Sequence, residues 1–85
     1  MELTRDNLKF FVMNNSKNKM DDMVRNGLLH PDFHACASCC WYASRLAWDQ
    51  AKAHVWNEYA LGFVSEFEAE LILSVLAEIC PSAND

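Results

Sequence analysis

Glycine and proline, the residues that most often interrupt helices and form tight turns, occur only twice each in this chain of 85 residues. An all-β fold needs more turn residues than this, and no segment alternates apolar and polar side chains long enough to predict a strand. We therefore expect an all-α protein. At this length the chain should form one domain, residues 1–85, built as a small bundle of about four helices.

The first third of the chain predicts two short helices. Thr4 is a suitable N-cap for a helix over residues 5–14, and Ser16 is one for a helix that runs to about Asn26. Gly27 then occupies the position after a helix end, where a positive φ is easily adopted by glycine. We expect these two helices to pack through one apolar side each.

The central stretch carries three of the four cysteines and all three tryptophans, and it predicts a long helix of about residues 33–60. Whether that helix continues through residues 53–59 stays open, because Val, Trp, Asn and Tyr there have middling helix propensity. At about 100° per residue, small side chains followed by two polar ones share one side of the helix. Such a seam lets another helix approach closely. It consists of Cys36, Cys40, Ala43, Ala47, Gln50 and His54.

The start of the last helix is the best defined boundary in the sequence. Ser65 and Glu68 have the spacing of a capping box, in which each side chain bonds to the other residue's backbone N–H. A C-terminal helix of about residues 66–80 should follow. Pro81 is expected to end it.

The net charge of −5 is unevenly distributed along the chain. Residues 1–34 carry five basic and five acidic side chains, whereas residues 35–85 carry two basic and seven acidic ones. A chain without a basic stripe is poorly suited to neutralise phosphates, so we expect no direct nucleic-acid binding. An acidic second half is better suited to a partner protein with a basic surface.

The first ten residues include Glu2, Arg5, Asp6 and Lys9 and contain no apolar segment of the kind found in signal peptides. No uncharged stretch approaches the roughly 18 apolar residues that a membrane helix needs. We therefore expect a cytoplasmic protein that makes no membrane contact. In a reducing compartment its cysteines should be thiols or metal ligands.

The cysteines permit two chemical interpretations besides packing. Cys36, Cys39, Cys40 and Cys80 provide enough soft ligands for a zinc site, although three of them crowd into two turns of one helix. A redox dithiol at Cys36 and Cys39 lacks the βαβ context that such motifs usually have. Free cysteine commonly behaves as a small buried hydrophobe, so packing is the preferred interpretation, and we expect no cofactor.

The tryptophans favour a binding function over catalysis. The sequence has no glycine-rich phosphate loop, and a small helical bundle offers little room for a catalytic cleft, so we expect no enzyme activity. Trp41 and Trp48 border a narrow polar stripe, and tryptophan is enriched where proteins bind one another. The residues expected to contact a partner are Trp41, Arg45, Trp48, Asp49, Lys52, Glu66 and Glu70.

The sequence thus predicts a small acidic helical protein–protein interaction module. We expect a homodimeric inhibitor or adaptor that occupies a surface of its partner, in the manner of small accessory proteins of phages and mobile elements. The alternative is a cysteine-rich, zinc-binding structural or regulatory module built on Cys36, Cys39, Cys40 and Cys80.

Overall fold

Five α-helices make up the fold of residues 2–80, the part of the chain that the computed structural model describes. They are α1 (Arg5–Asn14), α2 (Lys17–Arg25), α3 (Pro31–Ala43), α4 (Trp48–Ala60) and α5 (Glu66–Ile79). No strand occurs among these residues. The all-α class expected from the sequence is confirmed, with five helices in place of about four. A bilayer-spanning segment would need a longer and more apolar helix than any of those between residues 2 and 80.

Side-chain caps define the starts of α1, α2 and α5. Thr4, Ser16 and Ser65 each accept a hydrogen bond from the backbone N–H three residues later, at 3.1–3.2 Å. Ser65 also donates its own backbone N–H to Glu68 Oε1 at 2.7 Å, which completes the capping box. These three predicted boundaries are confirmed. Pro81, expected to end the last helix, lies outside the described residues.

Glycine ends α2 and α4 in the same way. Gly27 and Gly62 have φ angles of 74° and 84°, in the left-handed region that other residues enter at a cost. The residue after each glycine donates its backbone N–H to the carbonyl five residues earlier, at 2.8 and 3.0 Å. Both helices therefore end in a Schellman motif, which turns the chain sharply toward the next helix.

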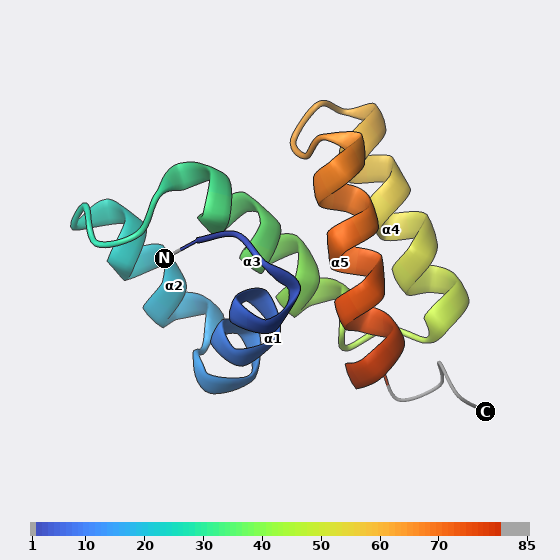
Figure 1. Cartoon of the computed structure of the whole chain (residues 1–85), viewed down its shortest axis with the longest axis horizontal. Helices are drawn as coiled ribbons and strands as arrows, with labels where there is room; N and C mark the ends of the chain where they lie inside the picture. Colours follow the sequence, from blue (N-terminus) through green and yellow to red (C-terminus); the bar gives the residue numbers. More distant parts are fainter. Residues whose placement is uncertain (1, 81–85) are drawn as a thin grey trace.

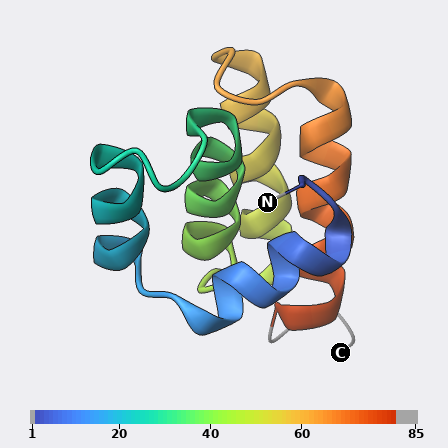
Figure 2. The same cartoon turned by 60° about the vertical axis from the view of Figure 1, so that its left-hand side comes forward.

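Helix α3 is the centre of the fold and packs against all four other helices. Helices α1 and α2 contact it from the N-terminal part of the chain, and α4 and α5 form an antiparallel hairpin beside it (Figure 1). Figure 2 shows α2 and α4 on opposite sides of α3. Such enclosure explains why the cysteine-rich stretch needs small apolar side chains.

The core of residues 2–80 contains only apolar side chains and cysteines. Phe11 of α1 and Phe33 of α3 pack edge to face, with ring centroids 5.2 Å apart. Burial of these groups is the main source of stability in a domain of this size. The largest fully buried side chains are Leu8, Met20, Cys36, Cys40, Val55, Ile72, Val75 and Leu76.

The prediction of one long central helix over about residues 33–60 is wrong, because residues 44–47 form a turn between α3 and α4. In a continuous helix Arg45 would donate its backbone N–H to the Trp41 carbonyl. That carbonyl instead accepts from Ser44 Oγ at 2.7 Å and from the Arg45 guanidinium at 2.8 Å. The Arg45 and Leu46 N–H groups bond to carbonyls three residues back, so the helix tightens and stops.

Tertiary packing accounts for the turn. A straight helix of 28 residues would extend about 42 Å, longer than the 38 Å longest dimension of the molecule. Reversal of the chain lets Ala51 and Val55 enter the core beside α3 and α5. The turn is tied to the end of α5, where the Cys80 thiol donates to the Leu46 carbonyl at 3.0 Å.

The predicted small-residue seam is correct for its first half only. Cys36, Cys40 and Ala43 are fully buried in α3, whereas Ala47 and Gln50 are exposed. The seam depended on a helix that continued past residue 43. The turn rotates the later positions away from it.

Candidate interaction surface

A groove of about 400 Å³ runs across the outer side of α3, between α2 and α4. Its floor uses positions 35, 38, 39 and 42, whose spacing places them on one side of the helix. Three of these residues are small, so the space between the flanking helices is not filled. The groove is lined by Lys17, His34, Ala35, Ser38, Cys39, Tyr42, His54, Glu58 and Phe63.

The α2 end of the groove is closed by a network centred on Asp21. Its carboxylate accepts hydrogen bonds from Lys17 Nζ and from His34 Nε2, the latter at 2.7 Å. These bonds, led by the one from Lys17, hold the pKa of Asp21 below its ordinary value. Lys17 and His34 thus both have an acidic partner within the protein.

Ser38 Oγ lies 3.3 Å from His34 Nε2, which places a serine, a histidine and a carboxylate together. A catalytic triad needs the carboxylate on one ring nitrogen and the serine on the other. Here Asp21 and Ser38 both face Nε2. The arrangement therefore fastens α2 to α3 and does not activate the serine as a nucleophile.

The α4 end of the groove is aromatic and acidic. The rings of Tyr42 and His54 stack with centroids 4.8 Å apart and planes tilted by 37°. His54 Nε2 lies 3.6 Å from Glu58 Oε1, and the Glu58 side chain is 24 % exposed. Burial, with a smaller effect of the Glu58 charge, raises the pKa of the Cys39 thiol to about 12. Cys39 therefore stays protonated at neutral pH and is a poor nucleophile.

The four cysteines are free thiols held in separate surroundings. Cys36 donates to Glu68 Oε2 at 3.2 Å, and Cys80 donates to the Leu46 carbonyl. Burial raises the pKa of Cys40 to about 12 and also raises that of Cys36. Metal ligation requires thiolates, and the raised pKa values of Cys36, Cys39 and Cys40 disfavour them.

The zinc ligand set of Cys36, Cys39, Cys40 and Cys80 is not assembled in the structure. Between residues 2 and 80, no three His, Cys, Asp or Glu side chains lie together in a way that could hold a metal ion. The Cys36 and Cys40 side chains are fully buried in helix contacts, Cys39 lies on the floor of the groove, and Cys80 reaches the turn after α3. Packing accounts for the burial of all four.

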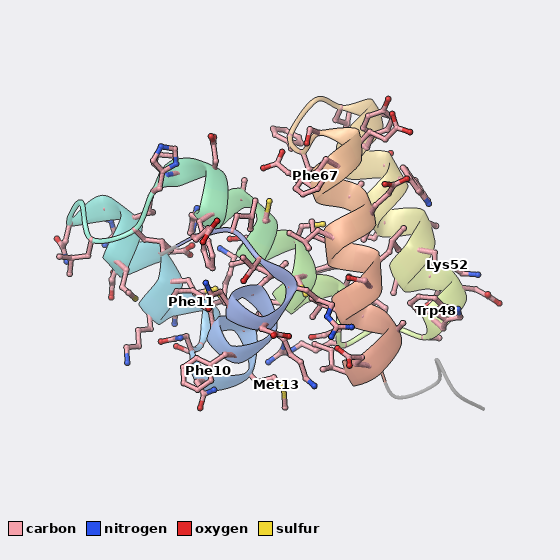
Figure 3. The ribbon with its side chains drawn as sticks, in the orientation of Figure 1. Phe10, Phe11, Met13, Trp48, Lys52 and Phe67 are labelled. Carbon is pink, nitrogen blue, oxygen red and sulfur yellow. The ribbon has the colours of Figure 1, made fainter. Side chains whose placement is uncertain are left out.

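The most exposed apolar surface of the hairpin lies at its closed end, residues 56–70, which we call the tip. Five large apolar side chains here are between 40 % and 67 % exposed. Trp56 and Tyr59 form an edge-to-face pair with centroids 5.8 Å apart. Figure 3 shows Phe67 at this end, on the first turn of α5. The exposed apolar residues of the tip are Trp56, Tyr59, Leu61, Phe63 and Phe67.

The tip is also acidic. Four glutamates fall within residues 56–70, and no lysine or arginine follows Lys52 in the sequence. Phe63 belongs both to the tip and to the lining of the groove, so the two features adjoin. The acidic residues of the tip are Glu58, Glu66, Glu68 and Glu70.

The structure divides the predicted partner-binding residues into separate groups. Trp41 and Arg45 form one pair at the end of α3, with the guanidinium carbon 3.4 Å from the ring centroid. Trp48 begins α4 and has Lys52 Nζ 5.2 Å from its ring centroid. Lys52 also pairs with Asp49 at 3.6 Å. These stacked pairs already satisfy much of each cation's interaction with its aromatic neighbour.

Glu66 and Glu70 lie far from those aromatic pairs. Helices α4 and α5 are antiparallel, so Trp48 and Lys52 lie at the open end of the hairpin and Phe67 at the closed end (Figure 3). The sequence grouped these glutamates with the tryptophans in one set of partner-binding residues. The structure instead places them at the tip, where Phe63 and Phe67 are exposed, and the sequence prediction had missed these two phenylalanines. A signal was present, because the interhelical segment Leu-Gly-Phe-Val-Ser is unusually apolar for a surface loop.

Comparisons with protein-family models, curated proteins and solved structures find no match for this chain. The fold and the surface geometry therefore carry the functional argument. They define a small all-α protein with an acidic aromatic tip and an adjoining groove.

Proposed function

We propose that this protein is a protein–protein interaction module that binds its partner through the tip. The observation that carries the proposal is the exposure of five large apolar side chains, four of them aromatic, at the closed end of the α4–α5 hairpin. Large clustered apolar surface is unusual on a small monomer and commonly marks an interface. Aromatic anchors of this kind contribute most of the binding energy in many complexes.

The partner is proposed to present basic side chains around an apolar socket. The tip has four carboxylates and no lysine or arginine, so its field attracts positive charge. Electrostatic attraction of this type chiefly accelerates association and weakens as salt is added. The same field disfavours a nucleic-acid partner.

We also propose that the protein acts as a homodimer in the cytoplasm, as a non-catalytic inhibitor or adaptor. A second exposed apolar pair, Phe10 and Met13, lies on α1. Figure 3 places this pair at the lower edge of the molecule and Phe67 at the upper part. Dimerisation through α1 would leave both tips free to bind.

Affinity capture from the cells that express the protein, with quantitative mass spectrometry, tests the tip. The bait is wild type, Phe67→Ser, or Leu28→Ser as a matched control in which a comparably exposed apolar side chain is changed outside both the tip and the proposed dimer face. The proposal expects one set of proteins to be lost with Phe67→Ser and kept with Leu28→Ser. Equal recovery with all three baits would contradict it.

Sedimentation velocity tests the dimer separately. Wild type should sediment as a dimer at micromolar concentration, and Phe10→Ser should sediment as a monomer. A monomeric wild-type protein would refute the dimer and leave the tip proposal standing.

A further inference from the structure

We infer, on the basis of the proposed function, that the groove receives an arginine side chain of the partner protein, placed between Tyr42 and Phe63 against the Glu58 carboxylate. Phe63 links this groove to the tip, so a partner bound at the tip can place one side chain in the groove. The groove's volume of about 400 Å³ is adequate for a side chain together with its flanking backbone atoms.

Glu58 provides the charge that selects a cation. Its side chain is only 24 % exposed, and in the described part of the chain its ion-pair partner is His54, at 3.6 Å. No lysine or arginine pairs with it among residues 2–80. A partly buried carboxylate that no lysine or arginine of residues 2–80 engages can accept the paired hydrogen bonds of a guanidinium.

The charges at the two ends of the groove differ. At the α2 end Lys17 and His34 are both engaged by Asp21, so that end offers little free charge of either sign. At the α4 end the Glu58 carboxylate is close enough to Cys39 to contribute to the raised pKa of that thiol. The groove is therefore most negative where its aromatic rings lie.

The aromatic rings favour arginine over lysine. Tyr42 is 54 % exposed and Phe63 is 63 % exposed, so each ring keeps accessible surface in the groove that Glu58 also lines, although one side of Tyr42 is covered by His54. A planar guanidinium can stack on an aromatic face while it donates two hydrogen bonds to a carboxylate. The ammonium group of a lysine would pair with the Glu58 carboxylate but has no planar face to stack on the rings.

The test is an NMR titration of the ¹⁵N-labelled protein with Nα-acetyl-arginine methylamide. The neutral isostere Nα-acetyl-citrulline methylamide is the ligand control. The arginine probe should shift the backbone amides of Tyr42, Glu58 and Phe63, and citrulline should shift them much less. Equal binding of the two probes, or shifts confined to other surfaces, would overturn the inference.

Two carboxylate variants locate the charge. Glu58→Gln should raise the dissociation constant of the arginine probe about 3- to 10-fold, the range expected when a charge-assisted bond is lost at a partly exposed site. Glu66→Gln removes a carboxylate from the tip without touching the groove and should leave the constant unchanged. Equal effects of the two variants would show that the probe senses only the general acidic field.

Failure of the arginine site is distinguishable from failure of the proposed function. The titration uses no partner protein, whereas the capture experiment depends on Phe67, which does not line the groove. Loss of captured proteins with Phe67→Ser, without arginine binding, would keep the interaction module and remove the arginine site. Arginine binding with unchanged capture would do the reverse.

Discussion

At Cys36 the serine variant should be more stable than the alanine variant, and at Cys40 the alanine variant should be the more stable one. Both thiols are fully buried, one helical turn apart on α3. Cys36 donates to the Glu68 carboxylate at 3.2 Å, whereas no hydrogen bond to the Cys40 thiol forms within residues 2–80. The two sites therefore share a packing environment and differ in hydrogen bonding.

The magnitudes follow from that difference. Removing one buried heavy atom, as either alanine variant does, costs about 0.5–1.5 kcal/mol of the free energy of unfolding. Cys36→Ala also loses a bond to a carboxylate, and we expect a further loss of about 0.5–1 kcal/mol, since Glu68 keeps its bond from Ser65 and is partly exposed. Cys36→Ser restores a donor and should recover about that amount.

At Cys40 the order reverses. Cys40→Ser buries a hydroxyl that can reach only backbone carbonyls already used within α3, so it should be about 1 kcal/mol less stable than Cys40→Ala. Within residues 2–80 no side chain is hydrogen-bonded to the Cys40 thiol, so we expect no side-chain acceptor to offset the loss of hydration.

Urea unfolding followed by circular dichroism, with reductant present, measures the four variants. With a slope of about 1 kcal/mol per molar urea, the expected differences shift the midpoint by about 0.5–1 M. The reasoning is refuted if serine is worse than alanine at both positions or better at both. Unfolding of either alanine variant would instead return the zinc interpretation to first place.

Three further predictions concern the rest of the fold. Gly62→Ala should destabilise the protein by about 1 kcal/mol, because φ of 84° is strained for any residue with a Cβ; thermal unfolding measures this, and an unchanged midpoint would contradict the described loop. The lowered pKa of Asp21 means that its bonds to Lys17 and His34 stabilise the folded protein above the usual Asp range and are lost as the pH falls below about 4. Asp21→Asn should therefore reduce the decline of the melting temperature on acidification, and an unaltered pH profile would argue against the network. Chelation with EDTA should leave helicity unchanged, while a loss of ellipticity would indicate a structural metal.

Local signals made much of the fold predictable from the sequence. The caps at Thr4, Ser16 and Ser65 act over three or four residues, so the starts of three helices can be derived without tertiary information. The positive φ of Gly27 is local in the same sense.

The turn at residues 44–47 has no such signal. It contains neither glycine nor proline, and Ala47 makes no side-chain cap. The chain turns there because Ala51 and Val55 gain burial beside α3 and α5, which depends on contacts distant in sequence. Helix propensity alone predicts that the helix continues through such a segment.

The candidate surface was only partly predictable, because exposure is a result of tertiary packing. Trp41 and Trp48 were expected at the interface because tryptophan is enriched there, but both are partly buried against the core. Glu66 and Glu70 were expected as steering charges, and they do lie on the exposed tip. The groove beside them depends on α2 and α4 lying on opposite sides of α3, which no local pattern encodes.

The affinity of the captured partner for wild type, Phe67→Ala and Leu28→Ala tests the central claim most directly. Isothermal titration should show that Phe67→Ala weakens binding about 10-fold or more, as truncation of an aromatic hot spot does. Leu28→Ala should leave the dissociation constant within about twofold, the size expected for a side chain outside the interface. Equal affinities for all three proteins would show that the tip is not the binding surface.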